Sequence, residues 1–210
     1  MGEVVLHDYW RSSAAYRVRI VLNLKGVPHR TAAIDLTRGE HDRDDYHSLN
    51  PQGLVPTLEI DGRVLTQSLA IIDYLDATHK HPPMVSSDPA RRARTLAQAL
   101  TIAADIHPVN NLRILNALRS DFGASEEQVR LWVQRWIASG FAALEESAPD
   151  EGLFGGATPD LADVCLVPQM YNARRFELDL SPYPKLVRID AAVRALEPVA
   201  RAAPEAVRPD

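Results

Sequence analysis

The spacing of apolar residues predicts alternating strands and helices at the start of the chain. Residues 4–6 (VVL) predict a short buried strand. The helix that follows has one face made by Val18, Val21, Leu22 and Lys25. Gly26 is a typical helix stop, and Pro28–Asp35 predicts a second strand. Such a strand–helix–strand unit normally has parallel strands and a right-handed crossover.

A second pattern of strands follows a charged stretch. Arg38–His47 predicts a short helix that ends near Leu49. Thr57–Ile60 and Arg63–Leu65 predict two strands, joined by Asp61-Gly62, a dipeptide typical of a two-residue type I′ hairpin. The helix that begins at Ser68 is expected to bury Leu69, Ile72 and Leu75.

The order of these elements, βαβα and then ββα, predicts a small mixed sheet of four strands with helices packed on it. This is the thioredoxin-like arrangement. Pro56 stands at the start of a hairpin strand, where it has no N–H to donate to a neighbouring strand, so we expect it at an edge or in a binding role.

The apolar periodicity is lost between residues 78 and 89 (THKHPPMVSSDP), a stretch with three prolines that we interpret as a linker. Beyond it every predicted element is helical: 90–120, 125–148, 160–173 and 184–196. We therefore predict an α/β plus all-α protein, with a thioredoxin-like domain over residues 1–80 and an all-helical domain over residues 90–210. The tail from Pro198 onward is expected to pack loosely.

The helix that starts near Asp160 is apolar nearly all round in its first half, so we expect it at the centre of the helical domain. Asp160 and Asp163 form a variant of the capping box, which favours a folding role for Asp163 over a catalytic one. Cys165 lies in the same apolar stretch, and packing is favoured over reactivity because reactive thiols need an electropositive, partly exposed site.

Composition excludes several classes of protein. The net charge is −5 and the basic residues are scattered, so nothing indicates a nucleic-acid partner. The apolar runs are too short to span a membrane, and Glu3, His7 and Asp8 interrupt any signal-peptide core, so we expect a cytoplasmic protein. A single cysteine leaves no internal disulfide and no C-x-x-C redox pair.

The stretch Tyr9–Gly26 carries the first candidate chemistry. Ser12 and Ser13 fall at the predicted helix N-terminus, where unpaired N–H groups and the helix dipole favour an anion. Both serines are also ordinary capping residues. Because no cysteine stands at this helix start, a reaction that uses a thiol there must take it from a ligand.

A small thiol peptide such as glutathione would find a partner for each of its parts. Ser12 or Ser13 can donate to the sulfur, and Val55 offers main-chain groups to a peptide that adds as a strand. Gln67 and Ser68, at the start of a second helix, favour a carboxylate. Each feature alone is also ordinary: a cap, a loop or a plain helix start.

Together the residues resemble the zeta-class glutathione transferases, the family of maleylacetoacetate and maleylpyruvate isomerases. The resemblance covers roughly Val4 to Ala192 and rests on SSAAYRVRIVLNLKG, NPQGLVPTL, QSLAIIDYLD, DIHPVNNLRIL and DLADVCLVPQMYNARRF. It implies the glutathione transferase fold, glutathione as cofactor, a cis Val55-Pro56 bond and a homodimer.

The resemblance also assigns roles by position. It places Ser12 and Ser13 on the segment that stabilises the thiol. It places the glutathione contacts on Gln52, Val55, Gln67 and Ser68, with His41, His107 and Asn111 as further contacts. Ala14 departs from the Ser-Ser-Cys of the maleylacetoacetate isomerases. Similar maleylpyruvate isomerases also lack that cysteine, so the change bears on the substrate rather than on the activity.

Arginines are the expected partners of a substrate with two carboxylates, because a planar guanidinium matches a carboxylate with two hydrogen bonds. The candidates are Arg11, Arg113 and Arg175, of which Arg11 directly precedes the catalytic turn. Each could instead be a surface residue or part of a structural ion pair. Arg174 serves as an internal comparison, since neighbouring helical residues point in different directions.

We therefore expect a glutathione-dependent cis–trans isomerase that acts on a small dicarboxylate, maleylpyruvate or maleylacetoacetate, in the catabolism of aromatic compounds. The alternatives are a transferase of the same fold that conjugates or dehalogenates electrophiles, and a non-enzymatic binding domain. The histidines show no pattern of metal ligands, so no metal is expected.

Overall fold

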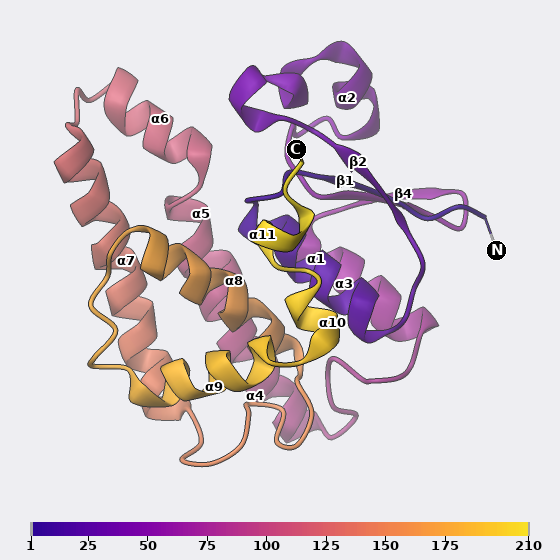
Figure 1. Ribbon diagram of the computed structural model, residues 1–210, viewed down its shortest axis with the longest axis vertical. Helices are drawn as coiled ribbons and strands as arrows, with labels where there is room; N and C mark the ends of the chain where they lie inside the picture. The colour runs from indigo at the N-terminus through magenta and orange to yellow at the C-terminus, as the bar shows by residue number, and fades with distance from the viewer. Residues whose placement is uncertain (1, 210) are drawn as a thin grey trace. The chain divides into compact units, whose positions relative to one another are not determined.

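The computed structural model describes residues 2–209 and divides them into two compact units (Figure 1). The first unit joins residues 2–84 to residues 195–209, and the second is Val85–Arg194. This division differs from the predicted domains at the C-terminal end, where the last residues belong with the N-terminal unit.

The first unit contains the predicted four-stranded mixed sheet. Its strands are β1 (Val5–Asp8), β2 (Arg30–Ala33), β3 (Thr57–Ile60) and β4 (Arg63–Thr66), in the order β2-β1-β3-β4. β1 and β2 are parallel, whereas β3 is antiparallel to both β1 and β4. The thioredoxin-like prediction is confirmed.

Helices α1 (Ser13–Leu24) and α3 (Ser68–Thr78) lie side by side on one face of the sheet (Figure 1). The short helix α2 (Asp44–Leu49) lies on the opposite side of the strands and follows the 3-10 turns η1 (Leu36–Arg38) and η2 (Glu40–Asp42). In α3 the buried positions are Ser68, Ile71, Ile72 and Leu75. The prediction that Leu69 is buried is wrong, because the buried face runs through Ser68 at helical spacing and leaves Leu69 half-buried.

The C-terminal segment packs closely against α1. Helix α10 (Glu197–Ala200), drawn in yellow, packs against α1, and α11 (Pro204–Val207) follows it in the chain (Figure 1). Nε of Arg19 donates to the carbonyl of Ala202 at 2.9 Å, and Nδ2 of Asn23 donates to the carbonyl of Pro198 at 2.9 Å. The predicted loose tail is wrong, since its small residues allow close packing and α1 supplies the hydrogen bonds.

Two buried cations, Arg19 of α1 and Lys25 directly after it, hold the first unit together. Nη1 of Arg19 donates to both carboxylate oxygens of Asp8 at 2.8 Å, and both side chains are almost fully buried. Nζ of Lys25 has no solvent contact and donates to Oδ1 of Asp76 and to the carbonyls of His79 and Pro82. Lys25 thus joins the end of α1 to the end of α3 and to the segment that follows it.

The second unit is helical, as predicted. It contains α4 (Pro89–Leu100), α5 (His107–Val109), α6 (Leu112–Ser120), α7 (Glu126–Ser147), α8 (Leu161–Arg175) and α9 (Pro184–Arg194). α8 packs against α4 and α9, and residues 161–170 are all buried. Its predicted central position is confirmed, and Cys165 is a buried free thiol.

The single helix predicted over residues 90–120 is interrupted. A π-helical turn, η3 (Thr101–Ile106), separates α4 from α5, and α5 ends at Asn110. Pro108 lacks the N–H that a regular α-helix would use here, and a widened turn before it relieves the clash of its ring with the preceding carbonyls. Gly140 of α7 lets η3 approach closely, because a Cβ there would meet the side chain of Ile106.

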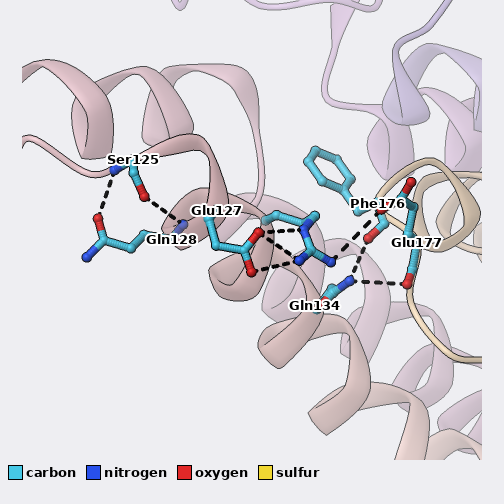
Figure 2. Close-up of polar contacts among 7 residues, drawn as sticks. Ser125, Glu127, Gln128, Gln134, Phe176 and Glu177 are labelled. Carbon is cyan, nitrogen blue, oxygen red and sulfur yellow. Dashed lines mark hydrogen bonds and ion pairs between the residues drawn. The ribbon is translucent and has the colours of Figure 1, made fainter.

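Polar contacts order the start of α7 and the end of α8 (Figure 2). Ser125 and Gln128 form a capping box at the start of α7. Nε2 of Gln134 donates to the carbonyls of Phe176 and Glu177, at 2.8 and 3.2 Å, and so holds the end of α8.

Within residues 2–209 no helix has the length and apolar character to cross a lipid bilayer.

Candidate functional site

The register of the sheet brings three predicted site segments of the first unit to one end of it. His7 of β1 is paired with Thr57 of β3, so the turn after β1 lies beside the residues just before β3. Thr57 is also paired with Thr66 of β4, so the start of α3 lies at the same end. The same end of the sheet is therefore surrounded by three segments: Ser12 and Ser13, Val55, and Gln67 with Ser68.

Ser12 and Ser13 form the start of α1, as predicted. Ser12 is the N-cap: its backbone is extended and its Oγ accepts the N–H of Ala15 at 3.2 Å. Ser13 is the first helical residue, and both side chains are half-buried. The Ser12 hydroxyl accepts with its oxygen, so its proton is available to donate to an anion.

Hydrogen bonds to the Leu54 carbonyl hold the loop that presents Val55. The carbonyl of Leu54 accepts the hydroxyl of Tyr46 at 2.7 Å and Nδ2 of Asn50 at 2.6 Å. Gly53 has a positive φ of 61°, and a Cβ there would lie 3.2 Å from the carbonyl of His41. The Val55-Pro56 peptide bond is cis, as the resemblance implied.

The start of α3 gathers the polar residues predicted to hold glutathione. Nε2 of Gln67 donates to Oε1 of Gln52 at 2.7 Å, so these two predicted contacts touch each other. Gln67 has φ 66°, an unusual backbone conformation for a residue with a side chain. Ser68 is buried, and its Oγ accepts Nε of the buried Arg17 at 3.1 Å.

Arg11 lies in the turn before α1, among aromatic rings. Its guanidinium lies 5.1 Å from the ring centre of Trp10 and 6.0 Å from that of Tyr9, and Nη2 donates to the Tyr9 hydroxyl at 3.2 Å. Arg208 of the C-terminal segment also lies over the Trp10 ring, at 5.2 Å. The orientation of Arg11 is therefore set by stacking and by one hydrogen bond.

His41 lies beside the loop that leads to Val55, since its carbonyl packs against Gly53. Its Nδ1 is shielded from solvent and has no hydrogen-bond partner within residues 2–209. Nε2 lies 3.5 Å from a carboxylate oxygen of Asp42. His47, which was not among the predicted site residues, packs its ring against the same Gly53.

The remaining predicted residues belong to the second unit. His107 begins α5, and Asn111 is the N-cap of α6, where its Oδ1 accepts the N–H of Ile114 at 3.2 Å. Arg113 is exposed in the first turn of α6. Asn111 thus has a structural role at the helix start.

Arg174 and Arg175 have different contacts, as expected for adjacent helical residues that point in different directions. Arg174 of α8 binds Asp190 of α9, a carboxylate with no solvent exposure. Arg175 is exposed at the last residue of α8, with its guanidinium 5.1 Å from the ring centre of Phe176. Gln134 fixes the backbone directly after it (Figure 2).

Comparison with known proteins assigns the chain to a family. Residues 11–78 match the model of the glutathione S-transferase N-terminal domain. The chain is 49% identical over 211 residues to a probable maleylacetoacetate isomerase of Vibrio cholerae, covering 98% of this chain and 97% of that protein. A holo structure of a maleyl pyruvate isomerase, a bacterial zeta-class glutathione S-transferase, superposes with a TM-score of 0.95 at 45% identity, covering 97% and 98%. The chain belongs to the zeta class of glutathione transferases.

A further similar structure carries ligands. It is a maleylacetoacetate isomerase from Methylobacterium extorquens with bound malonate and glutathione, 36% identical, with a TM-score of 0.92 and coverage of 96% of this chain and 97% of that one. Its ligands are a dicarboxylate and the thiol tripeptide. These are the two chemical classes for which the sequence of this zeta-class chain provides candidate residues.

Asp163 of this zeta-class chain has the surroundings of a folding residue. Its buried carboxylate accepts the N–H groups of Phe154, Gly155 and Asp160, between 2.9 and 3.0 Å. Burial and the neighbouring Asp160 carboxylate raise the pKa of Asp163 to about 7, whereas the three N–H donors act in the opposite direction. The group links the loop before α8 to the helix start.

Three residues that touch the predicted site were not selected from the sequence: Arg17, Tyr46 and Asn50. Each acts on a site segment from behind, through Ser68 or through the Leu54 carbonyl. Arg17 shares α1 with Arg19, and no local pattern marks it as buried. Tyr46 and Asn50 have no such pattern either, since their partner is a main-chain carbonyl.

Proposed function

We propose that this zeta-class protein is a glutathione-dependent cis–trans isomerase that converts a maleyl keto-diacid, maleylpyruvate or maleylacetoacetate, to its fumaryl isomer during the breakdown of aromatic compounds. The observation that carries the proposal is the meeting of Ser12 and Ser13, Val55, and Gln67 with Ser68 at one end of the sheet. The isomerase relatives, aligned over nearly the whole chain, support the reaction and the substrate class.

The residues present fit glutathione. α3 begins without a side-chain cap, so the N–H groups of its first turn can donate to a carboxylate of the ligand. Gln52 and Gln67 add amide groups beside that helix start, and Val55 adds main-chain groups for a peptide. At the start of α1 the Ser12 hydroxyl and the helix dipole favour a thiolate over a thiol.

Glutathione, when bound, supplies a thiolate that adds reversibly to the cis double bond and leaves after rotation about the single bond. The serines at the start of α1 hold the sulfur and lower its pKa, which raises the fraction of nucleophile at neutral pH. Arg11, Arg113 and Arg175 are proposed to bind the carboxylates of the substrate and to stabilise the negative charge that develops on its keto oxygen. His41, His107 and Asn111 are proposed as further contacts to the tripeptide.

The decisive experiment incubates the enzyme with maleylpyruvate or with maleylacetoacetate, with and without glutathione. The loss of the cis-enone absorbance and the concentration of free thiol are both followed. An isomerase removes the absorbance only when glutathione is present and leaves the thiol concentration unchanged. Consumption of thiol in step with substrate would instead indicate a conjugating transferase, and equal rates without thiol would refute the proposal.

The roles of the two serines can be separated. Ser12→Ala and Ser13→Ala are titrated with bound glutathione, and the thiolate absorbance is followed against pH. We expect Ser12→Ala to raise the pKa of the bound thiol, because Ser12 is the residue whose oxygen already accepts an N–H and whose proton can point outward. A pKa unchanged in both variants would assign thiolate stabilisation to the backbone N–H groups.

We also propose that the protein works as a homodimer in the cytoplasm. β4 is an edge strand of the sheet, and its Val64 keeps 46% of its surface exposed, which offers an apolar contact to a second copy. Light scattering coupled to size exclusion should give twice the mass of the 210-residue chain, and a monomer at micromolar concentration would contradict the assembly. Cell fractionation tests the location.

A further inference from the structure

Arg17 is a buried cation behind the start of α3. It lies on α1, only 3% of its surface is exposed, and its Nε donates to Oγ of Ser68 at 3.1 Å. Ser68 is itself 5% exposed and is the first residue of α3. A charged donor on one helix is therefore bonded to the hydroxyl that opens the other.

This bond determines how the hydroxyl can be used. A guanidinium only donates hydrogen bonds, so the Ser68 oxygen is the acceptor and its own proton must point to another partner. Donation from a cation also polarises the O–H bond and makes it a stronger donor, an effect that is larger in a buried, low-dielectric environment. Ser68 is thereby set as a donor toward an anion.

The helix start in front of Ser68 has an opening for such an anion. The N-cap residue Gln67 makes no capping hydrogen bond with its side chain, which is turned instead to Gln52. The other long helices with a described N-cap begin with a side-chain acceptor: Ser12, Asp88, Asn111, Ser125 and Asp160. In α3 the acceptor for the first N–H groups can come from the ligand.

We propose that Arg17 is a positioning residue for glutathione: it fixes the Ser68 hydroxyl as a donor to one carboxylate of the tripeptide and places a positive charge behind that carboxylate. The proposal rests on the proposed function, because it assigns a role within the same glutathione site. Arg17 acts through Ser68 and not on the sulfur.

The test measures glutathione binding by calorimetry without substrate. Arg17→Met should weaken binding about 10- to 100-fold, the effect expected for losing a charge-assisted hydrogen bond. Arg17→Lys keeps the charge and loses the Nε donor, so it should fall between Arg17→Met and the wild type. The pKa of the bound thiol and kcat at saturating glutathione should stay close to wild type, which a general disturbance of the fold would not allow.

A double-mutant cycle tests whether Arg17 acts through Ser68. If it does, Arg17→Met should weaken binding much less in a Ser68→Ala background than in the wild type. The matched control is Arg19→Met, which also removes a buried arginine of α1 but one bonded to Asp8 and Ala202. Its effect should add to that of Ser68→Ala.

Two glutathione analogues, one without the γ-glutamyl α-carboxylate and one without the glycine carboxylate, identify the group that is bound. The effect of Arg17→Met should disappear with one of them and persist with the other. If the Arg17 variants do not fold, the Nε–H resonance of Arg17 in the wild type provides the measurement. It should shift on binding glutathione and not on binding the analogue that lacks the carboxylate.

The outcomes separate the two proposals. If the wild type does not bind glutathione, the proposed function fails. Three results would overturn the role of Arg17 while the proposed function stands, provided that the wild type binds glutathione. The Arg17→Met variant could bind glutathione as tightly as the wild type, or lose affinity for glutathione and both analogues by the same factor. The effects of Arg17→Met and Ser68→Ala on affinity could also be fully additive. An unmoved Nε–H resonance overturns the role of Arg17 in the same way.

Discussion

Replacing Lys25 by methionine removes an ammonium group from a site without solvent contact and keeps most of the aliphatic stem. In the wild type, Nζ lies 2.9 Å from Oδ1 of Asp76, 2.6 Å from the carbonyl of His79 and 2.8 Å from that of Pro82. The same Asp76 oxygen accepts the N–H of Met84 at 2.8 Å. The substitution therefore leaves a carboxylate and two carbonyls without their common donor.

The size of the destabilisation follows from the groups that lose the ammonium as a donor. Breaking a buried ion pair by removing one partner costs about 3–5 kcal/mol, because the remaining charge is no longer compensated. The carboxylate of Asp76 keeps only 13% of its side-chain surface exposed, so solvent can offset little of this. We expect Lys25→Met to lower the free energy of unfolding by about 3–5 kcal/mol, a large part of the stability of a typical domain.

Urea unfolding followed by far-UV circular dichroism measures the loss, with the slope of the transition checked against the wild type. The same substitution at the exposed Lys80 is the matched control and should change the free energy by less than about 0.5 kcal/mol. Asp76→Asn keeps an acceptor for Met84 but removes the charge, so it should restore part of the loss in the Lys25→Met background. A loss below about 1 kcal/mol for Lys25→Met would refute the reasoning.

Three further predictions concern the second unit. Arg175→Ala should lower kcat/KM for the dicarboxylate by a factor that corresponds to about 1.5–3 kcal/mol of transition-state stabilisation, the value of a lost charged hydrogen bond. The control Arg91→Ala, at an exposed position, should leave kcat/KM unchanged. Equal kinetics of Arg175→Ala and the wild type would remove Arg175 from the site. The pKa of Asp163 is raised by burial and by Asp160 from its ordinary value of 3.8 to about 7. Its contribution to stability is therefore complete below pH 3.8 and is lost as the pH rises through 7, by at most about 1.4 kcal/mol per pH unit. Urea unfolding at several pH values should show that the free energy of unfolding falls between pH 4 and 7, and Asp163→Asn should reduce this pH dependence. An unchanged pH dependence in the variant would contradict its assignment to Asp163. Ser125→Ala should cost about 1 kcal/mol through the lost cap of α7, as measured by thermal or urea unfolding, and Ser125→Asp should restore it.

The elements that the sequence predicts well are those specified by neighbouring residues. The hairpin around Asp61-Gly62, the capping box at Asp160 and the buried course of α8 are each determined by contacts within a few positions along the chain. The family was also readable, because its motifs lie in such segments. Glutathione as cofactor and the glutathione transferase fold are confirmed by the relatives.

What the sequence conceals is the burial of charge. Arg17 and Arg19 stand among the apolar residues of α1, where a helical pattern alone would place them at the surface, yet both are nearly fully buried. One partner of each arginine lies far away in sequence: Ser68 for Arg17 and the Ala202 carbonyl for Arg19. Long-range pairs of this kind leave no local pattern.

The position of the C-terminal segment has a consequence for biosynthesis. A ribosome delivers the sheet and α1 before the helical unit, but the residues that cover α1, including the carbonyls that bind Arg19 and Asn23, emerge only after that whole unit. The nascent first unit must therefore keep these polar side chains hydrated, or satisfied elsewhere, while the whole helical unit is made. The fold of the first unit is thus completed only after the second unit has been synthesised.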